Sequence, residues 1–189
     1  MKLLYSAITS LDGYVADEDG RFDWAKPDDE LHAFVNDLER SVGTYLYGRR
    51  MYDVMVYWET APTGAGAHPI AADYARVWQA ADKVVFSSTL AQVPTRRTRL
   101  ERQLDAHLVS EIKAASRGDL TVGGPTLAAE ALRLDLVDVV ELLWCPILLG
   151  GGVPVLSAGV RRDLRLRSER RFSNGVIHAT YDVIGHEQS

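Results

Sequence analysis

The alternation of short apolar stretches with segments of helical spacing is the feature that most constrains how this chain can fold. The apolar stretches are rich in β-branched and aromatic residues, and the segments between them repeat apolar residues every three or four positions. The pattern predicts strands at 2–9, 43–48, 83–88, 98–100, 119–123 and 137–152, and helices at 28–40, 49–58, 70–81, 104–116 and 125–132. A βαβα order of this kind predicts an α/β fold, with a mostly parallel central sheet flanked by helices on both faces.

The C-terminal stretch departs from this alternation. Residues 164–172 alternate apolar and charged side chains, and residues 175–185 are rich in β-formers. Between them lies Ser173-Asn174-Gly175, and the Asn-Gly pair is a strong hairpin signal. We therefore expect an antiparallel C-terminal hairpin at one edge of the sheet.

Composition limits the class of protein. The chain has 189 residues, of which 47% are hydrophobic, and this suits one domain over residues 1–189. The net charge of −5 argues against nucleic acid or an anionic membrane as a partner. The N-terminal apolar run is too short and too polar for a signal peptide or a spanning helix. With a single cysteine, Cys145, and hence no intrachain disulfide, we expect a cytoplasmic protein.

Three predicted strands end in residues that could bind an anion, and ligands of such sheets gather at the carboxyl ends of strands. In Val122-Gly123-Gly124-Pro125-Thr126, Gly124 can cap the following helix with Pro125 as its first residue, so that free N–H groups face an anion. Gly48-Arg49-Arg50 follows a second strand, and arginine binds phosphate in a two-pronged manner. Ser87-Ser88-Thr89 follows a third and offers hydroxyl donors.

Each of these signals has a simpler explanation when taken alone: a tight turn, two solvated arginines, or ordinary capping. Together they predict a site for a nucleotide with more than one phosphate. No G-x-G-x-x-G follows the first strand, and no P-loop lysine motif is present. The arginines of the run 96–102 could attract an anionic cofactor, although a solvated face explains them more simply.

Five segments carry a resemblance to a known family. In chain order they read SAITSLDGYVA, YGRRMYD, KVVFSST, LTVGGPTLAAEALRLDLVDVVEL and PILLGGGVPVL. With these segments the sequence resembles the dihydrofolate reductase-like superfamily, most closely the branch related to the C-terminal reductase domain of the riboflavin-biosynthesis protein RibD. The resemblance spans nearly the whole chain. It implies a dihydrofolate reductase-like three-layer fold and an NADPH-dependent oxidoreductase.

The resemblance also implies which residues bind NADPH. Arg49 and the two serines would hold the 2′-phosphate and the adenosine end, and the glycine pair with the helix start would line the pyrophosphate path. Backbone groups near the N-terminus would position the nicotinamide carboxamide. The implied cofactor-binding residues are Ala7, Val15, Gly48, Arg49, Arg50, Ser87, Ser88, Gly123, Gly124, Thr126 and Leu127.

Two further points follow from the resemblance. The loop at 12–24 would close over the reacting centre and exclude water. Met51 stands where the GRxT motif of folate reductases has threonine, so a hydroxyl contact to phosphate is in doubt at that position.

Hydride addition to a C=N bond needs a proton for the nitrogen, and a carboxylate with a raised pKa can assist. In folate reductases this acid lies early in the first helix, shortly after a tryptophan. Here Trp24 is followed by Asp28, Asp29 and Glu30; the spacing favours Asp29, with Glu30 close to it. Asp12, beside the expected lid, is a second candidate catalytic residue. Helix capping and turn formation explain the same acids without catalysis.

Several interpretations stay open. The first is a reductase that acts on a small heterocyclic substrate such as a pterin or pyrimidine. The second is a nucleotide-binding module without turnover, and the third is a reductase of riboflavin biosynthesis acting on a 5-amino-6-(ribosylamino)uracil-type substrate. The histidines and Cys145 lack metal-ligand spacing, so no metal site is predicted. The apolar segment 145–156 suggests a homodimer, although burial in the core would explain it equally well.

Overall fold

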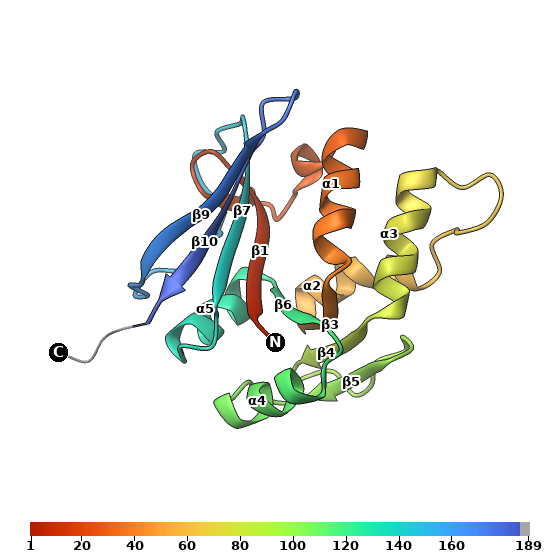
Figure 1. Ribbon diagram of the computed structural model, residues 1–189, viewed down its shortest axis with the longest axis vertical. Helices are drawn as coiled ribbons and strands as arrows, with labels where there is room; N and C mark the ends of the chain where they lie inside the picture. The colour runs from red at the N-terminus through yellow and green to blue at the C-terminus, as the bar shows by residue number, and fades with distance from the viewer. Residues whose placement is uncertain (186–189) are drawn as a thin grey trace.

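An eight-stranded sheet forms the centre of the computed structural model, which describes residues 1–185 (Figure 1). In spatial order the strands are β5 (Thr98–Glu101), β4 (Asp82–Phe86), β3 (Val42–Gly48), β6 (Asp119–Gly123), β1 (Leu3–Ser10), β7 (Val139–Cys145), β10 (Ile177–Ile184) and β9 (Asp163–Arg171). The first six in this order are parallel, and β10 runs antiparallel to β7 and to β9. This confirms the mixed sheet with an antiparallel C-terminal hairpin. Residues 186–189 of the expected domain lie outside the described residues.

Helices cover both faces of the sheet. They are α1 (Asp29–Glu39), α2 (Arg49–Met55), α3 (Pro69–Ala80), α4 (Ala106–Ala115) and α5 (Pro125–Arg133), with 3-10 helices at Asp23–Ala25 and Val56–Glu59. The residues of α4 and α5 share one apolar core with Leu3 and Leu120. On the other side α1 and α3 lie next to each other (Figure 1), and Trp78 of α3 is fully buried against β3. In residues 1–185 no helix is long and apolar enough to cross a membrane.

Capping side chains decide where two helices begin. The Asp28 carboxylate accepts the Leu31 N–H at 2.9 Å, and the Asp105 carboxylate accepts the Leu108 N–H at 2.8 Å. These bonds satisfy N–H groups that have no partner within the helix. As a result α4 starts at Ala106, two residues later than the apolar spacing predicts.

One expectation for the loops was wrong. The strand predicted over 137–152 ends at Cys145, because Pro146 follows and has no N–H to donate to a ladder. The three glycines therefore lie in a loop that leads to a short strand, β8 (Val153–Pro154). Within the expected lid loop, β2 (Tyr14–Ala16) pairs antiparallel with β8. The segment 12–24 is thus partly a strand, and it is joined to the glycine loop.

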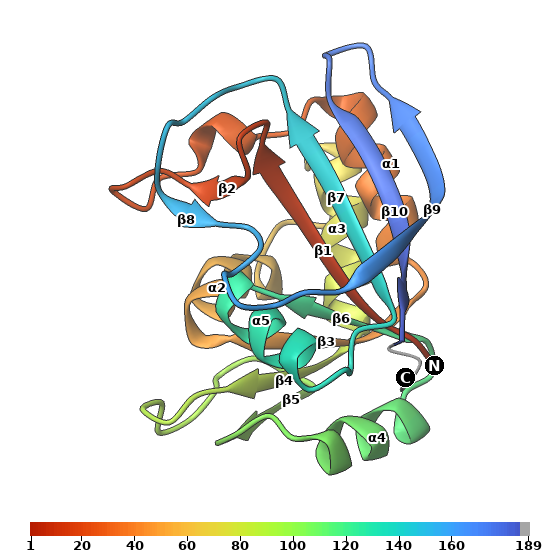
Figure 2. The same ribbon diagram turned by 90° about the vertical axis from the view of Figure 1, so that its left-hand side faces the viewer.

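The sheet opens between β1 and β6, and this opening positions the site. The two strands pair only from Leu3–Leu120 to Tyr5–Val122, whereas β1 continues to pair with β7 as far as Ser10–Cys145. Figure 2 shows β1 extending well beyond the end of β6. The edge of β1 that faces β6 is therefore left without a strand partner after Tyr5 in the described part of the chain.

Candidate functional site

The carboxyl ends of β4, β3 and β6 lie next to one another in the sheet. Ser87 follows β4, Arg49 follows β3 at the start of α2, and Gly124 follows β6 at the start of α5. The three groups that the sequence singles out therefore meet at one edge of the sheet, beside the opening between β6 and β1. Ala7, on the extended part of β1, and Val15, on β2, border the same opening.

Glycine is required at the two positions after β6 for different structural reasons. Gly124 has φ +97°, a conformation that side chains rarely adopt, and it caps α5 with Pro125 as the first helical residue, as predicted. Gly123 has ordinary dihedrals, but a Cβ there would lie 2.7 Å from the Tyr47 ring and 3.1 Å from Met51 Cγ. Gly124 thus permits the turn, while Gly123 lets β6 and α2 approach closely.

The start of α5 has the properties of an anion cradle. No side chain caps it, so N–H groups of its first turn, including those of Thr126 and Leu127, are left for water or a ligand. The helix dipole adds a partial positive charge at the same place. Thr126 is exposed and Leu127 is buried in the core, so the hydroxyl of Thr126 and the backbone of Leu127 are the groups that could face an anion.

The guanidinium of Arg49 reaches from α2 to the loop after β4. Its Nη1 donates to Thr89 Oγ1 at 2.9 Å, and its Nε lies 3.7 Å from Asp53 Oδ2. Ser87 is buried, and its Oγ accepts the backbone N–H groups of Thr89 and Leu90 at 3.3 and 3.1 Å. Ser87 therefore shapes this loop, which extends from residue 87 to residue 90.

The same loop reveals a residue whose role the sequence pattern did not indicate. Arg102, from the basic run expected to be solvated, donates to the carbonyl groups of Ser87 at 2.9 Å and Leu90 at 2.7 Å. The loop is thus held between two guanidinium groups, Arg49 and Arg102. Ser88 and Arg50 are exposed at this edge and form no hydrogen bond or ion pair with other side chains of residues 1–185.

Asp12 joins the lid segment to the glycine loop. Its carboxylate accepts the Ser10 hydroxyl at 2.6 Å and the N–H groups of Leu149 and Gly150 at 3.1 and 2.7 Å. These hydrogen bonds, that of Ser10 first, lower the pKa of Asp12. Since a proton donor needs a raised pKa, this geometry favours a structural role for Asp12 over the expected catalytic one.

The acids at the start of α1 lie in different surroundings. Glu30 accepts the Ser173 hydroxyl at 2.6 Å and lies 3.3 Å from Arg170, and the hydrogen bond from Ser173 is the main cause that lowers its pKa. Asp29 is largely exposed, and its Oδ1 lies 3.6 Å from His68 Nε2. Of the candidate acids, Asp29 is the one whose carboxylate remains accessible and accepts no strong hydrogen bond from the rest of residues 1–185.

Trp24 contributes an unusual buried group near these acids. Its Nε1 is buried without a hydrogen-bond partner in the described structure, and its ring packs into the apolar cluster that contains Leu31 and Cys145. Buried polar groups are nearly always hydrogen-bonded, so an unpaired donor marks a place where a ligand or water would be accepted.

In residues 1–185 no three histidine, cysteine or carboxylate side chains come together as metal ligands.

A mostly parallel sheet, a glycine turn into α5 and an arginine at the neighbouring strand end agree with the fold and site that the resemblance to the dihydrofolate reductase-like class implies. The chain belongs to the RibD C-terminal domain family, whose model matches residues 1–178.

Relatives and solved structures agree with this assignment. The uncharacterised protein YyaP of Bacillus subtilis is 24% identical over 182 residues, which cover 95% of this chain and 94% of YyaP. A structure from Shewanella sp. PV-4, provisionally assigned to riboflavin biosynthesis, has 23% identity and a TM-score of 0.77 over 98% of this chain and all of that one.

A bifunctional deaminase and reductase from Thermotoga maritima has a TM-score of 0.66 and 17% identity over 97% of this chain. Its second named activity is that of a 5-amino-6-(5-phosphoribosylamino)uracil reductase. The present chain spans 56% of that protein. At these identities the structural likenesses establish the fold.

Proposed function

We propose that this protein is an NADPH-dependent reductase that transfers a hydride to a small heterocyclic substrate, a pterin or a pyrimidine. The observation that carries the proposal is the opening between β1 and β6, flanked by the Gly124 turn and by Arg49. When bound, NADPH supplies the hydride. The residues of the chain bind it, orient it and exclude water.

The residues present fit such a cofactor. At Gly124 the backbone has φ +97°, which side chains rarely adopt, and no side chain caps α5, so the turn leaves the first N–H groups of that helix open to a ligand. The N–H groups of that turn would hold the pyrophosphate. Arg49, with Ser88 exposed beside it, would hold the 2′-phosphate, and the unpaired edge of β1 at Ala7 would bind the carboxamide, with Val15 opposite.

The riboflavin-type substrate is the second candidate, and it is supported by the structural likeness to the Thermotoga maritima protein, which is named as a 5-amino-6-(5-phosphoribosylamino)uracil reductase. A 5-amino-6-(5-phosphoribosylamino)uracil carries a pyrimidine ring with amino groups that hydrogen-bond donors and acceptors can recognise. Steady NADPH oxidation with this compound, and none with dihydropterins, would select it. Binding of NADPH without turnover on either would instead favour the nucleotide-binding module.

Replacing Arg49 with alanine tests the cofactor assignment. A charge-assisted contact to the 2′-phosphate contributes about 1.5–3 kcal/mol, so Arg49→Ala is expected to weaken NADPH binding roughly 10- to 100-fold. NADH, which lacks that phosphate, should bind both proteins alike. Fluorescence titration measures each affinity, with Arg171→Ala as the control because Arg171 is an exposed arginine on β9 and no part of the proposed cofactor site. An unchanged ratio of NADPH to NADH affinity in Arg49→Ala would contradict the assignment.

Three amide substitutions test the proton donor. If Asp29 supplies the proton, Asp29→Asn should lower turnover about 10²- to 10⁴-fold and leave NADPH affinity unchanged. Glu30→Gln and Asp12→Asn remove carboxylates that already accept hydrogen bonds, so they should lower thermal stability more than Asp29→Asn does. If Asp12→Asn or Glu30→Gln loses turnover at unchanged stability while Asp29→Asn keeps it, the proton donor is Asp12 or Glu30 instead of Asp29.

We also propose that the protein forms a homodimer. The edge strand β9 supports this, because its residues are exposed and its outward side chains include Leu164 and Leu166. Unpaired strand edges readily pair with another chain. In the apolar segment 145–156, Leu148 and Leu156 are exposed and could contribute.

A further inference from the structure

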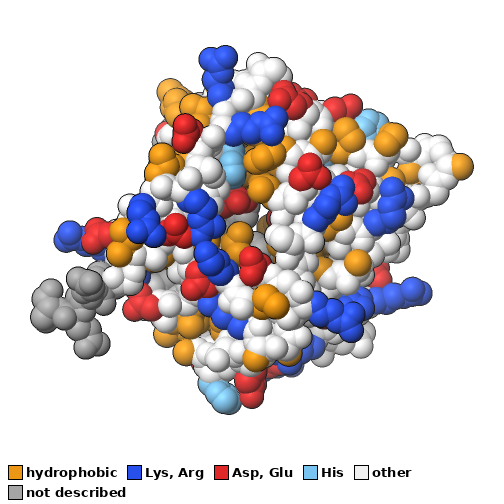
Figure 3. Space-filling view, viewed as in Figure 1, with side chains coloured by type: hydrophobic (Ala, Val, Ile, Leu, Met, Phe, Trp, Pro, Cys, Tyr) orange, Lys and Arg blue, Asp and Glu red, His pale blue; other side chains and the backbone are white. Residues whose placement is uncertain are grey.

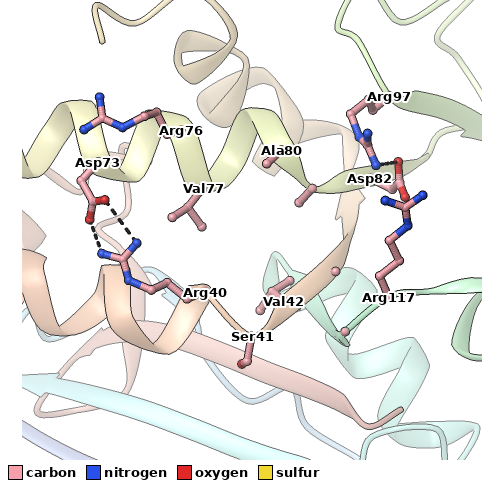
Figure 4. A pocket seen from close by; sticks show the side chains of 13 residues that line it. Arg40, Ser41, Val42, Asp73, Arg76, Val77, Ala80, Asp82, Arg97 and Arg117 are labelled. Atoms are coloured by element: carbon pink, nitrogen blue, oxygen red, sulfur yellow. Dashed lines mark hydrogen bonds and ion pairs between the residues drawn. The ribbon is translucent and has the colours of Figure 1, made fainter. Parts of the chain in front are cut away.

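A second cavity lies at the opposite edge of the sheet from the proposed cofactor site. It has a volume of about 840 Å³ and lies where β3 and β4 begin, between the ends of α1 and α3 and the turn before β6 (Figure 4). Small-molecule sites commonly have volumes of roughly 300–1,000 Å³. The proposed reductase site uses the carboxyl ends of the strands, so this cavity, called here the arginine basin, has no role in it.

The lining of the arginine basin is strongly basic. It contains four guanidinium groups and two carboxylates, which leaves an excess of two positive charges in a chain of net charge −5. These residues are Arg40, Arg76, Arg97, Arg117, Asp73 and Asp82. Over the face of the molecule seen in Figure 3 as a whole, basic and acidic side chains are interspersed. A local excess of this kind attracts anions.

The four arginines differ in how far they are already paired. Arg40 forms two hydrogen bonds with Asp73, at 3.2 and 2.6 Å, and Arg97 lies 2.9 Å from Asp82. Within the described part of the chain, Arg76 donates to the Thr63 carbonyl alone, at 3.0 Å.

Arg117 forms no hydrogen bond or ion pair with any other side chain in residues 1–185, and Figure 4 shows its guanidinium beside Arg97 and Asp82. Arg97 and Arg117 thus lie side by side at this wall, and of the two Arg97 forms the ion pair with the Asp82 carboxylate. The second of them is available to an added anion.

The helix dipole explains only part of this arrangement. Arg40 is the C-cap residue of α1, where a cation is favourable. Arg97 lies in the loop before β5, and its backbone has φ +55°, one of two positive φ values among the non-glycine residues described. Such a conformation is unfavourable for a side chain and is often retained at functional sites. The guanidinium of Arg97 lies at the wall of the arginine basin, 2.9 Å from Asp82.

The floor between the charged walls is apolar. Figure 4 shows Val42, Val77 and Ala80 between the Arg40–Asp73 pair on one side and Arg97 and Arg117 on the other. A site with an apolar floor and a cationic wall is suited to a ligand with an apolar body and an anionic group. We propose that the arginine basin binds the phosphate monoester of a small aromatic molecule, with the phosphate at Arg117 and Arg97 and the ring on Val42 and Val77.

Calorimetric titration with phenyl phosphate, in phosphate-free buffer of low ionic strength, tests this proposal. Hydrogen bonds to charged groups contribute about 1.5–3 kcal/mol, so Arg117→Glu and Arg117→Ala should weaken binding by about tenfold or more. Inorganic phosphate should bind more weakly than phenyl phosphate, because it makes no use of the apolar floor. Since Arg117 forms no ion pair within residues 1–185, its variants should unfold at the wild-type temperature.

Two control variants locate the binding. Arg171→Glu changes an exposed arginine on the distant strand β9 and should leave the affinity within about twofold. Arg49→Ala changes the proposed cofactor site and should leave it equally unaffected. The proposal is overturned if phenyl phosphate does not bind saturably, if Arg117→Glu binds as tightly as the wild type, or if the affinity is lost in Arg49→Ala. None of these outcomes depends on whether the protein is a reductase.

Discussion

The Gly152→Ala variant is expected to lose roughly 3 kcal/mol or more of its free energy of unfolding. Gly152 has φ +131°, and a Cβ there would overlap the Ala16 carbonyl oxygen and lie 2.9 Å from the Asp17 backbone. Left-handed strain contributes about 1–2 kcal/mol, and overpacking against backbone contributes about 1–3 kcal/mol. Because Ala16 belongs to β2, the added methyl should also separate β2 from β8 and expose the opening beside β1. Urea unfolding measures the stability, and hydrogen exchange of residues 12–17 measures the separation.

Gly150 provides a matched control in the same loop. It also has a positive φ, +76°, but nothing lies within 4 Å of the position that a Cβ would take. Gly150→Ala should therefore show only the left-handed strain of about 1–2 kcal/mol, and its N–H would still bind Asp12. Equal losses of stability in the two variants would mean that overlap of the added methyl with Ala16 contributes nothing to the loss, which would contradict the prediction.

A Glu39→Gln variant should be more stable than the wild type at pH 8 and equally stable at pH 4. Glu39 ends α1, and although part of its side chain reaches the surface, its Oε2 is buried without a hydrogen-bond partner in the described structure. Burial, opposed by the Tyr45 hydroxyl and assisted by the negative charge of Glu141, raises the pKa of Glu39 from 4.5 to about 7.

The direction in which stability changes with pH follows from the raised pKa of Glu39. Well below pH 4.5 Glu39 is protonated in both the folded and the unfolded chain, so it does not make the free energy of unfolding depend on pH. Between pH 4.5 and about 7 the unfolded chain ionises first, and stability falls as the pH rises; above pH 7 the loss levels off at something on the order of 3 kcal/mol. Glutamine does not ionise, so the variant should lack this loss.

Urea unfolding of both proteins at several pH values between 4 and 8 measures the effect. Glu130→Gln, on the exposed face of α5, serves as the control and should follow the wild type at every pH. A difference between Glu39→Gln and the wild type that stays constant with pH would show that the carboxyl ionises as freely in the folded chain as in the unfolded one.

The strand ends of this fold could be predicted from the sequence because their signals are local. Apolar runs that stop at Gly48, Ser87 and Gly123 mark three neighbouring strand ends, and the Gly124-Pro125 pair correctly predicts the start of α5. The hairpin at Asn174-Gly175 is equally local. Sequence periodicity is sufficient for features that depend on a few consecutive residues.

The features that escaped prediction depend on residues far apart in the chain. Asp12 is read from its neighbours as a turn residue, and its hydrogen bonds to Leu149 and Gly150 arise only after the sheet has formed. The burial of Glu39 depends on strands β3 and β7 in the same way. Arg102 and Arg97 belong to one basic run, yet β5 lies between them and carries them to opposite edges of the sheet.

The place of β1 in the middle of the sheet has a consequence for how the chain folds as it is made. Strand β1 pairs with Leu120 and Val139, which are synthesised more than one hundred residues later. At about 5–20 residues per second, β1 waits roughly 7–27 s until both of its neighbours have been made. Pairings between such distant segments make folding slow. The apolar strand β1 is therefore left without its partners for this time, and chaperone protection during synthesis would benefit it.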